Sequence, residues 1–474
     1  MSLGAPYAWA LWRGAVLATL AAAIGLGLSA LLAGTGGRAR RAAWAAVVVP
    51  FLTPVLLVGY AWSNFSLSLV RHPVANELLY DALLLMKLTP VAAFVLYFAP
   101  AFFSPQAVHC RRLLRPGERG ARALASYIVF MARGPVRAGL VAFGVVFLLA
   151  VGEFEMASLM GVRTWTVGLF DAHAGGLALA ESLRLAALPA LTELALLVLL
   201  LAVLFRARGT PQGAGVRAGP GAAARVLLWC YLGAALALVA CVPGWIVLRG
   251  TVEGVRMLAQ SFVMTKDIAA SVLFGAGAAA CAYATAGWFV GRELGRARLA
   301  AAFVLCVPGM LGALVLSLVL VYVFQRIGWR GAYDSPLPLV LALSALLFPL
   351  ALLLRVLLHV LGGGSAQHAA GLLGGSASAR VRAWHGRLMW QLRARPRFWV
   401  AFLLFCWGYF DMTASAILAP AGMTTVTARL YNLMHYGRTE VLSAMVCAAF
   451  VVPFLLILAA EGARGAASRV VRHG

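Results

Sequence analysis

Apolar segments of about twenty residues recur along almost the whole chain, and they limit the folds that it can adopt. Eleven such segments occupy residues 8–33, 43–66, 80–102, 138–160, 177–205, 226–248, 268–290, 299–325, 335–361, 398–420 and 441–460. A helix of about 20 apolar residues crosses a bilayer, whereas a membrane β-barrel shows shorter segments in which apolar and polar residues alternate. Since 63% of the residues are hydrophobic and only 11% are charged, the sequence predicts an all-α polytopic integral membrane protein with eleven spans.

The basic residues are divided unevenly between the loops that join these segments. The loops on one side of the predicted membrane hold 26 arginines and lysines, and the loops on the other side hold nine. Cytoplasmic loops of membrane proteins are rich in Lys and Arg. We therefore expect a multi-pass protein of the bacterial cell (inner) membrane, with its N-terminus outside and its C-terminus in the cytoplasm. The same distribution explains the net charge of +24 without a nucleic acid partner.

Two acidic motifs inside predicted spans indicate an internal repeat. The stretch "GEFEM" at 152–156 recurs as "GYFDM" at 408–412, a constant shift of 256 residues that pairs Glu155 with Asp411. Spans one to five also match spans seven to eleven in order, length and orientation. This predicts a parallel 5+1+5 repeat, unlike the inverted repeats of many secondary transporters. We expect a first transmembrane domain at 1–206, a cytoplasmic linker at 207–225, a linker span at 226–249 and a second transmembrane domain at 250–474.

A parallel duplication with a long basic loop in each half resembles the fused permease subunits of binding-protein-dependent ABC importers, above all those of the iron(III) and thiamine type. In that family each long loop carries a motif of the form E-A-A-x-x-x-G. The second long loop, "SAQHAAGLLGG", keeps the spacing of this motif at His368, Ala369, Ala370 and Gly374, with His in place of Glu. In the first long loop His109 takes the place of the Glu and Arg115 takes the place of the Gly.

The resemblance implies partners on both sides of the lipid bilayer. Short helices in the long loops would dock into separate cytoplasmic ATPase subunits, and a solute-binding protein would dock on the outside. The chain would then be no enzyme and would bind no cofactor itself, because ATP and Mg would sit on the partner ATPase. It has no GxxxxGK[ST] loop of its own. In the second loop, Gly374 and Gly375 are expected to end a short helix from His368 to Leu373.

Four residues of the acidic motifs are candidates for a substrate pathway: Glu153, Glu155, Tyr409 and Asp411. A charge inside a span costs about 2.5–3.5 kcal/mol on insertion scales, so such acids need a role. Carboxylates that line a path would favour a hard cation such as ferric iron. Alternatively the acids are structural, either protonated or bonded to backbone or to an arginine, or Glu155 simply meets water near the outer end of its span. Gly152 and Gly408 would let a neighbouring helix approach closely.

The segments that follow the acidic motifs also resemble each other. Residues 423–436 have apolar residues at helical spacing and predict a short amphipathic helix in the outer interface, and 164–173 is its match in the first half. The family resemblance implies an outer gate or a docking surface for the binding protein, formed by Trp165, Phe170, Arg429, Tyr431, His435 and Tyr436. Tyrosine and histidine are also common interfacial anchors, and we expect no metal site here.

Two other classes of function stay open from the sequence. An ATP-independent secondary transporter would also be polytopic, and a polytopic membrane enzyme is the third alternative. The enzyme has little support, because the chain contains neither HExxH nor GxSxG. Its seven cysteines show no CxxC pair and no metal-ligand spacing.

Overall fold

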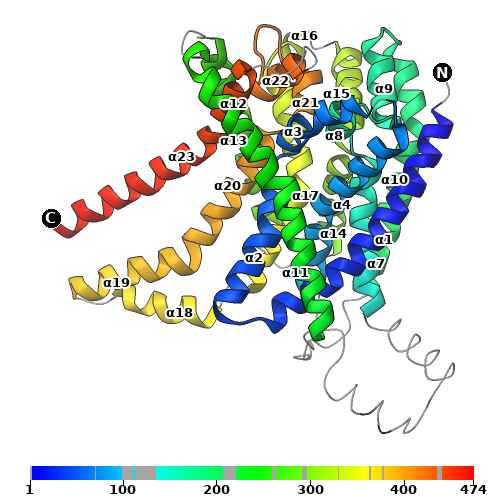
Figure 1. Cartoon of the computed structure of the whole chain (residues 1–474). Coiled ribbons are helices and arrows are strands. Elements are labelled where there is room, and N and C mark those ends of the chain that lie inside the picture. The colour runs from blue at the N-terminus through cyan, green and yellow to red at the C-terminus, as the bar shows by residue number, and fades with distance from the viewer. Residues whose placement is uncertain are drawn as a thin grey trace. The chain divides into compact units, whose positions relative to one another are not determined.

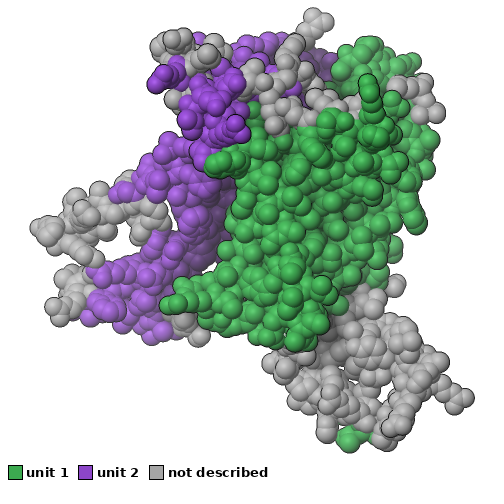
Figure 2. All heavy atoms as spheres, viewed as in Figure 1, with its two compact units in different colours: residues 1–247 green, residues 248–474 purple. Residues whose placement is uncertain are grey.

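The protein is all-helical over the part that its computed structural model describes (Figure 1). This part is residues 3–473 apart from 70, 99–109, 111, 112, 114–134, 207–219, 259–262, 291–295, 329, 362, 363, 376, 377 and 435–439. These described residues form helices joined by short turns, and they contain no β-strand. The chain divides into two compact units, Met1–Val247 and Leu248–Gly474, which Figure 2 distinguishes by colour.

Each unit is built from a series of helices of very different lengths. The first unit contains α1 (Gly4–Gly34), α2 (Gly37–Leu52), α3 (Val55–Ser68), α4 (Pro73–Phe98), α7 (Pro135–Val151), α8 (Glu155–Leu159), α9 (Trp165–Ala174), α10 (Leu179–Arg206), α11 (Ala222–Leu236), the π-helical turn η2 (Ala237–Cys241) and the start of α12 (Val242–Leu258). The second unit contains the rest of α12, α13 (Val263–Val290), α14 (Arg296–Met310), α15 (Ala313–Ile327), α16 (Arg330–Tyr333), α17 (Leu337–Leu361), α18 (Gly364–Leu372), η3 (Leu373–Gly375), α19 (Ala379–Met389), η4 (Trp390–Ala394), α20 (Arg395–Tyr409), α21 (Thr413–Leu418), α22 (Val426–Met434) and α23 (Glu440–His473).

Many of these helices have the length and composition of membrane spans. Among the described residues, eight helices qualify, and the number rises to ten if each of two bent helix pairs crosses once. The chain is therefore a multi-pass membrane protein by length and apolar character. The predicted span at 398–420 is not a continuous helix, because α20 ends at Tyr409 after 15 residues and α21 begins at Thr413.

The two bent pairs break for different local reasons. Between α2 and α3 the axis bends by 75°. Thr53 has an extended backbone (φ −61°, ψ 119°), as expected of a residue before a proline, whose ring disfavours the helical conformation of its predecessor. Between α14 and α15 the bend is 101°, and Gly312 stands there with φ +82°, which residues with a side chain rarely adopt.

In each unit three long helices pack around small residues. Helices α1, α4 and α7 contact one another in the first unit, as do α13, α17 and α20 in the second (Figure 1). A Cβ added to Gly14 would lie 2.7 Å from the Val151 side chain, and one added to Gly275 would lie 2.9 Å from the Tyr409 backbone nitrogen. Small residues let membrane helices approach closely, so these two glycines set the crossings of α1 with α7 and of α13 with α20.

Candidate functional site

The α7–α8 break in the first unit is capped by its own acidic residue. Glu153 lies between the two helices, and its carboxylate accepts hydrogen bonds from the backbone N–H groups of Met156 (2.5 Å) and Ala157 (3.1 Å). The first N–H groups of a helix have no partner within it, and an acidic side chain just before the helix satisfies them. Glu153 therefore stabilises the start of α8 within a predicted span.

The α20–α21 break in the second unit has the same cap. The Oδ1 atom of Asp411 accepts hydrogen bonds from the backbone N–H groups of Ala414 (2.9 Å) and Ser415 (3.4 Å). These donors lie three and four residues after the acid, as Met156 and Ala157 do after Glu153. The two acids thus perform the same local task in the two units.

A threonine pair completes each break. The backbone oxygen of Glu153 accepts a hydrogen bond from the Thr166 hydroxyl (2.7 Å), and that of Asp411 accepts one from Thr427 (2.8 Å). Each donor also lies beside the hydroxyl of a threonine two residues earlier, Thr164 at 2.7 Å and Thr425 at 3.3 Å. A helix break leaves carbonyls unsatisfied, and the segment that follows supplies the donors in both units.

These contacts correct the sequence register. Glu153, and not Glu155, makes the bonds that Asp411 makes, so the shift between the acids is 258 residues rather than 256. Glu155 is the first residue of α8 and corresponds to Thr413, the first residue of α21. The matching letters of "GEFEM" and "GYFDM" suggested an alignment that the backbone does not follow.

The glycine expectation holds for one motif only. A Cβ on Gly408 would lie 3.3 Å from the Cα of Gly275 on α13, which is a close helix–helix approach. A Cβ on Gly152 would meet only Leu148 of its own helix and the Glu193 carboxylate. Glu193 is buried on α10, and neither of its carboxylate oxygens has a hydrogen-bond partner among the described residues.

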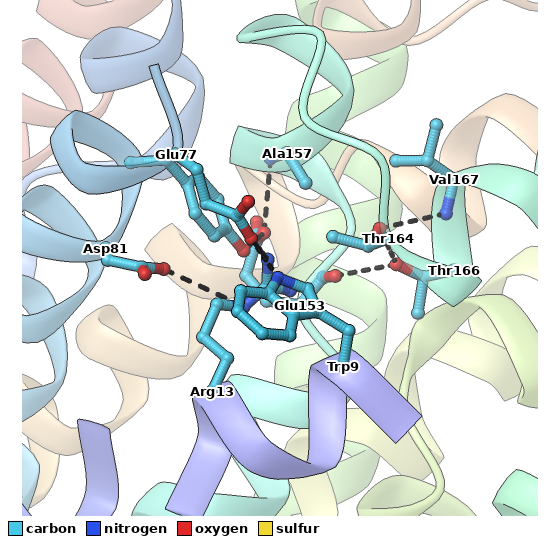
Figure 3. A network of polar contacts seen from close by, with 10 residues as sticks. Trp9, Arg13, Glu77, Asp81, Glu153, Ala157, Thr164, Thr166 and Val167 are labelled. Carbon is cyan, nitrogen blue, oxygen red and sulfur yellow. Dashed lines mark hydrogen bonds and ion pairs between the residues drawn. The ribbon is translucent and has the colours of Figure 1, made fainter. Parts of the chain in front are cut away.

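A polar network surrounds Glu153 in the first unit (Figure 3). The Tyr80 hydroxyl donates a hydrogen bond to the second Glu153 oxygen (2.6 Å), and the Arg13 guanidinium lies 4.9 Å from the centre of the Tyr80 ring. Arg13 forms ion pairs with Glu77 (3.2 Å) and Asp81 (3.7 Å). Arg13 of α1 therefore contacts two acids of α4 directly, and Tyr80 links it to Glu153 in the break.

Sequence reasoning missed this network. Glu77, Tyr80 and Asp81 stand at i, i+3 and i+4, a spacing that places them on one face of α4. That spacing was a usable signal. The partner helix could not be predicted, because no local sequence pattern indicates that Arg13 of α1 faces α4.

Lys87 is a second residue whose role the structure assigns. It is buried on α4, and its ammonium donates hydrogen bonds to the backbone oxygens of Pro50 (3.2 Å), Phe51 (3.4 Å) and Thr53. A cation at the C-terminal end of a helix satisfies unpaired carbonyls and the helix dipole. Lys87 thus caps α2 at the α2–α3 break, and it also interacts electrostatically with Glu155.

In the second unit an ion pair holds α22 against α13. The Arg429 guanidinium pairs with Asp267 of α13 through two nitrogens, and the second of these contacts measures 3.4 Å. The Val426 backbone N–H donates to the Ser271 hydroxyl at 2.8 Å. Arg429 is therefore paired with an acid of its own unit.

The aromatic residues assigned to an outer gate pack inside their units. Trp165 is buried, donates from Nε1 to the Val151 oxygen (2.8 Å) and meets Tyr7 edge to face. The Phe170 ring packs on Phe154. Two further candidates are also buried, Tyr431 on α22 and Tyr409, which bonds to the Ala449 oxygen at 3.0 Å. His435 and Tyr436 lie outside the described residues.

The second long loop contains the helix α18, which begins at Gly364, four residues before the predicted start at His368, and ends at Leu372, one residue before the predicted end, where the 3₁₀ turn η3 follows. His368 and Ala369 are exposed on α18, whereas Ala370 is buried and its backbone oxygen lies 2.7 Å from Nδ1 of His385. A Cβ on Gly374 would meet the His385 ring at 3.1 Å. The hairpin of α18 and α19 is thus closed on His385. His109 and Arg115 of the first loop lie outside the described residues.

Comparison with known proteins gives no relative from which a function could be transferred. No protein-family model, curated protein or solved structure matches this chain. Within the described part of the chain, no group of three or more His, Cys, Asp and Glu side chains is placed to hold a metal ion.

Proposed function

We propose that this chain is the permease subunit of a bacterial ABC importer, and that its two halves are copies of one transmembrane domain. The observation that carries the proposal is the matched pair of capped helix breaks at Glu153 and Asp411. A bundle that repeats in parallel, with the same motif at the same place, is what the resemblance to fused permeases requires. The domain limits that we propose are 1–206, a linker at 207–225, a linker span at 226–249, and 250–474.

The α18 helix supports a docking role for the second long loop. Leu372 at its end is 71% exposed and follows the exposed face of His368 and Ala369. The leucine is exposed on a short helix whose other side is bonded to His385. Such a helix is suited to insertion into the cleft of a partner protein. We assign this face to an ATPase subunit, which would provide the ATP and Mg chemistry.

We assign structural roles to Glu153 and Asp411 in this importer. Their carboxylates are occupied by backbone N–H groups, so they hold the helix breaks in shape. Glu155 stays the candidate for the pathway, together with the Lys87 cation that acts on it. The cargo, iron(III) or a similar small solute, comes from the resemblance alone. The proposed location is the inner membrane, with the N-terminus outside and the C-terminus inside.

The docking helix can be tested with a matched pair of variants. Affinity-tagged chain is purified from its native cells in mild detergent, and the amount of co-purified ATPase is measured per permease. Leu372→Glu is expected to lower this ratio about tenfold, because a charge would enter an apolar cleft. Gln391→Glu adds the same charge at an exposed position of η4 and should leave the ratio unchanged. An equal ratio for both variants would refute docking through α18.

One observation favours the second candidate, an ATP-independent secondary transporter. Helices broken inside the membrane, such as α2–α3 with its buried Lys87, are typical of such transporters. The two candidates differ in their energy source. Uptake that survives ATP depletion but stops with an uncoupler would support the secondary transporter, and the reverse result would support the importer.

A further inference from the structure

The second unit contains a cavity that opens widely to the surface and whose polar lining is dominated by arginine. Its volume is about 650 Å³, and it is lined by Tyr283, Arg355, Gly386, Met389, Trp390, Arg393, Ala394, Arg397, Phe398 and Ala401. These residues come from α13, α17, α19, η4 and α20. None of these ten described residues is acidic, so the cavity concentrates positive charge that its own lining does not neutralise.

Arg355 is held against Tyr283 of α13 on one side of this cavity. Its guanidinium lies 3.6 Å from the centre of the Tyr283 ring and donates a hydrogen bond to the Tyr283 backbone oxygen at 3.2 Å. It can lie flat on α13 because Gly287 has no side chain, and a Cβ there would come within 2.6 Å of the guanidinium. The buried Nε of Arg355 has no hydrogen-bond partner among the described residues. A guanidinium held in this way at the lining of the cavity is a binding group for an anion.

Two further arginines approach the same space. Arg393 belongs to the π-helical turn η4, and Arg397 follows four residues later in the first turn of α20. Arg397 and Arg393 line the same cavity as Arg355, so three positive charges share one space. Such convergence of like charges is unfavourable by itself and becomes favourable when an anion lies between the guanidinium groups.

The rest of the lining is mostly apolar, and Arg355 places the cavity at one end of a candidate span. Arg355 is one residue from the end of the candidate span Leu337–Val356. The Trp390 and Phe398 rings pack 6.5 Å apart, and aromatic residues are enriched where a bilayer meets water. An amphipathic ligand would place its charge on the arginines and its apolar part against these rings.

We propose that this cavity binds the phosphate group of an anionic phospholipid. Basic pockets between transmembrane helices are suited to lipid headgroups, and the aromatic wall distinguishes a lipid from a free phosphate ion. The π-helical turn is consistent with a binding role, since such turns are frequent at functional sites. The proposal does not depend on the identity of the transported solute.

The test uses full-length protein, stripped of lipid in detergent and titrated in native mass spectrometry. Phosphatidylglycerol is the anionic lipid, phosphatidylethanolamine is the zwitterionic lipid, and inorganic pyrophosphate is the soluble anion. The double variant Arg393→Gln/Arg397→Gln is compared with Arg387→Gln/Arg395→Gln, which removes the same charge from exposed positions outside the cavity.

We expect phosphatidylglycerol to bind the wild type and the Arg387→Gln/Arg395→Gln control equally. Its affinity for Arg393→Gln/Arg397→Gln should fall about tenfold or more, because two charge-assisted hydrogen bonds are lost. Phosphatidylethanolamine should bind weakly to all three proteins. An equal loss in both double variants would show a general charge effect and overturn the site. Pyrophosphate that binds in an Arg393-dependent way, and that phosphatidylglycerol does not displace, would assign the cavity to a soluble anion and overturn the lipid proposal.

Discussion

Glu153 and Asp411 occupy equivalent places in the two units. Each carboxylate accepts backbone N–H groups three and four residues ahead, and each backbone oxygen accepts the hydroxyl of the second threonine in a Thr-x-Thr sequence. The surroundings differ, because Glu153 is also bonded to Tyr80 and linked through it to Arg13. The same break is therefore built twice, with the larger polar network in the first unit.

Removing the cap should destabilise the second unit. Asp411→Ala deletes the acceptor of the Ala414 and Ser415 N–H groups, and loss of a helix cap costs about 0.5–2 kcal/mol. Thermal unfolding in detergent should show a lower midpoint for Asp411→Ala than for Asp334→Ala, which changes an exposed acid of the same unit. Equal midpoints would mean that the Asp411 carboxylate does not stabilise the break.

The two threonine donors should be energetically alike. Thr166→Val and Thr427→Val each leave a backbone oxygen without its hydroxyl donor, which costs about 1–3 kcal/mol for a buried group. Both residues are buried, so similar losses in unfolding free energy are expected. Thr19→Val serves as the control, because its hydroxyl bonds only to its own helix at an exposed position. A loss confined to one of the two threonines would argue against equivalent breaks.

Much of the architecture could be predicted from the sequence, and the limits have physical causes. Long apolar helices follow from composition, and Gly374 predicted the end of α18 to within a few residues, since the helix stops at Leu372 and Gly374 lies in the 3₁₀ turn that follows. Identical letters in the two acidic motifs could not show which glutamate corresponds to Asp411. The correspondence depends on which carboxylate accepts the backbone N–H groups at the helix break. The sequences "TWT" at 164–166 and "TVT" at 425–427 mark the segments whose hydroxyls bond to the broken backbone, but they lie 261 residues apart, so they do not give the 258-residue shift of the acids either. Arg13 and Lys87 act across helices, and no local pattern reports such contacts.

Lys87 should hold the α2–α3 break in shape. Lys87→Met keeps most of the side-chain volume but removes the donor for the Pro50, Phe51 and Thr53 oxygens. Hydrogen bonds to a charged group contribute about 1.5–3 kcal/mol, so amide hydrogen exchange in α2 and α3 should accelerate. Lys266→Met, at an exposed position of α13, should leave these amides unchanged. Unaltered exchange in Lys87→Met would contradict the capping role.

The Asp267–Arg429 pair should couple α22 to α13. A double-mutant cycle with Asp267→Asn and Arg429→Gln measures the interaction free energy directly. The Asp267 side chain is only 6% exposed and that of Arg429 is 33% exposed, so we expect a coupling of about 1–3 kcal/mol, above the range of exposed ion pairs. A coupling near zero would show that α22 is held by packing and by Ser271 alone.

The proposal that this chain is the permease of an ATP-driven importer requires an ATPase in a separate chain. The most direct measurement is the mass and composition of the intact complex, isolated from native cells in mild detergent with nucleotide present. We expect the 50.0 kDa chain in complex with two copies of a separate P-loop ATPase. A chain that is reproducibly isolated alone, or only with proteins that bind no nucleotide, would contradict it.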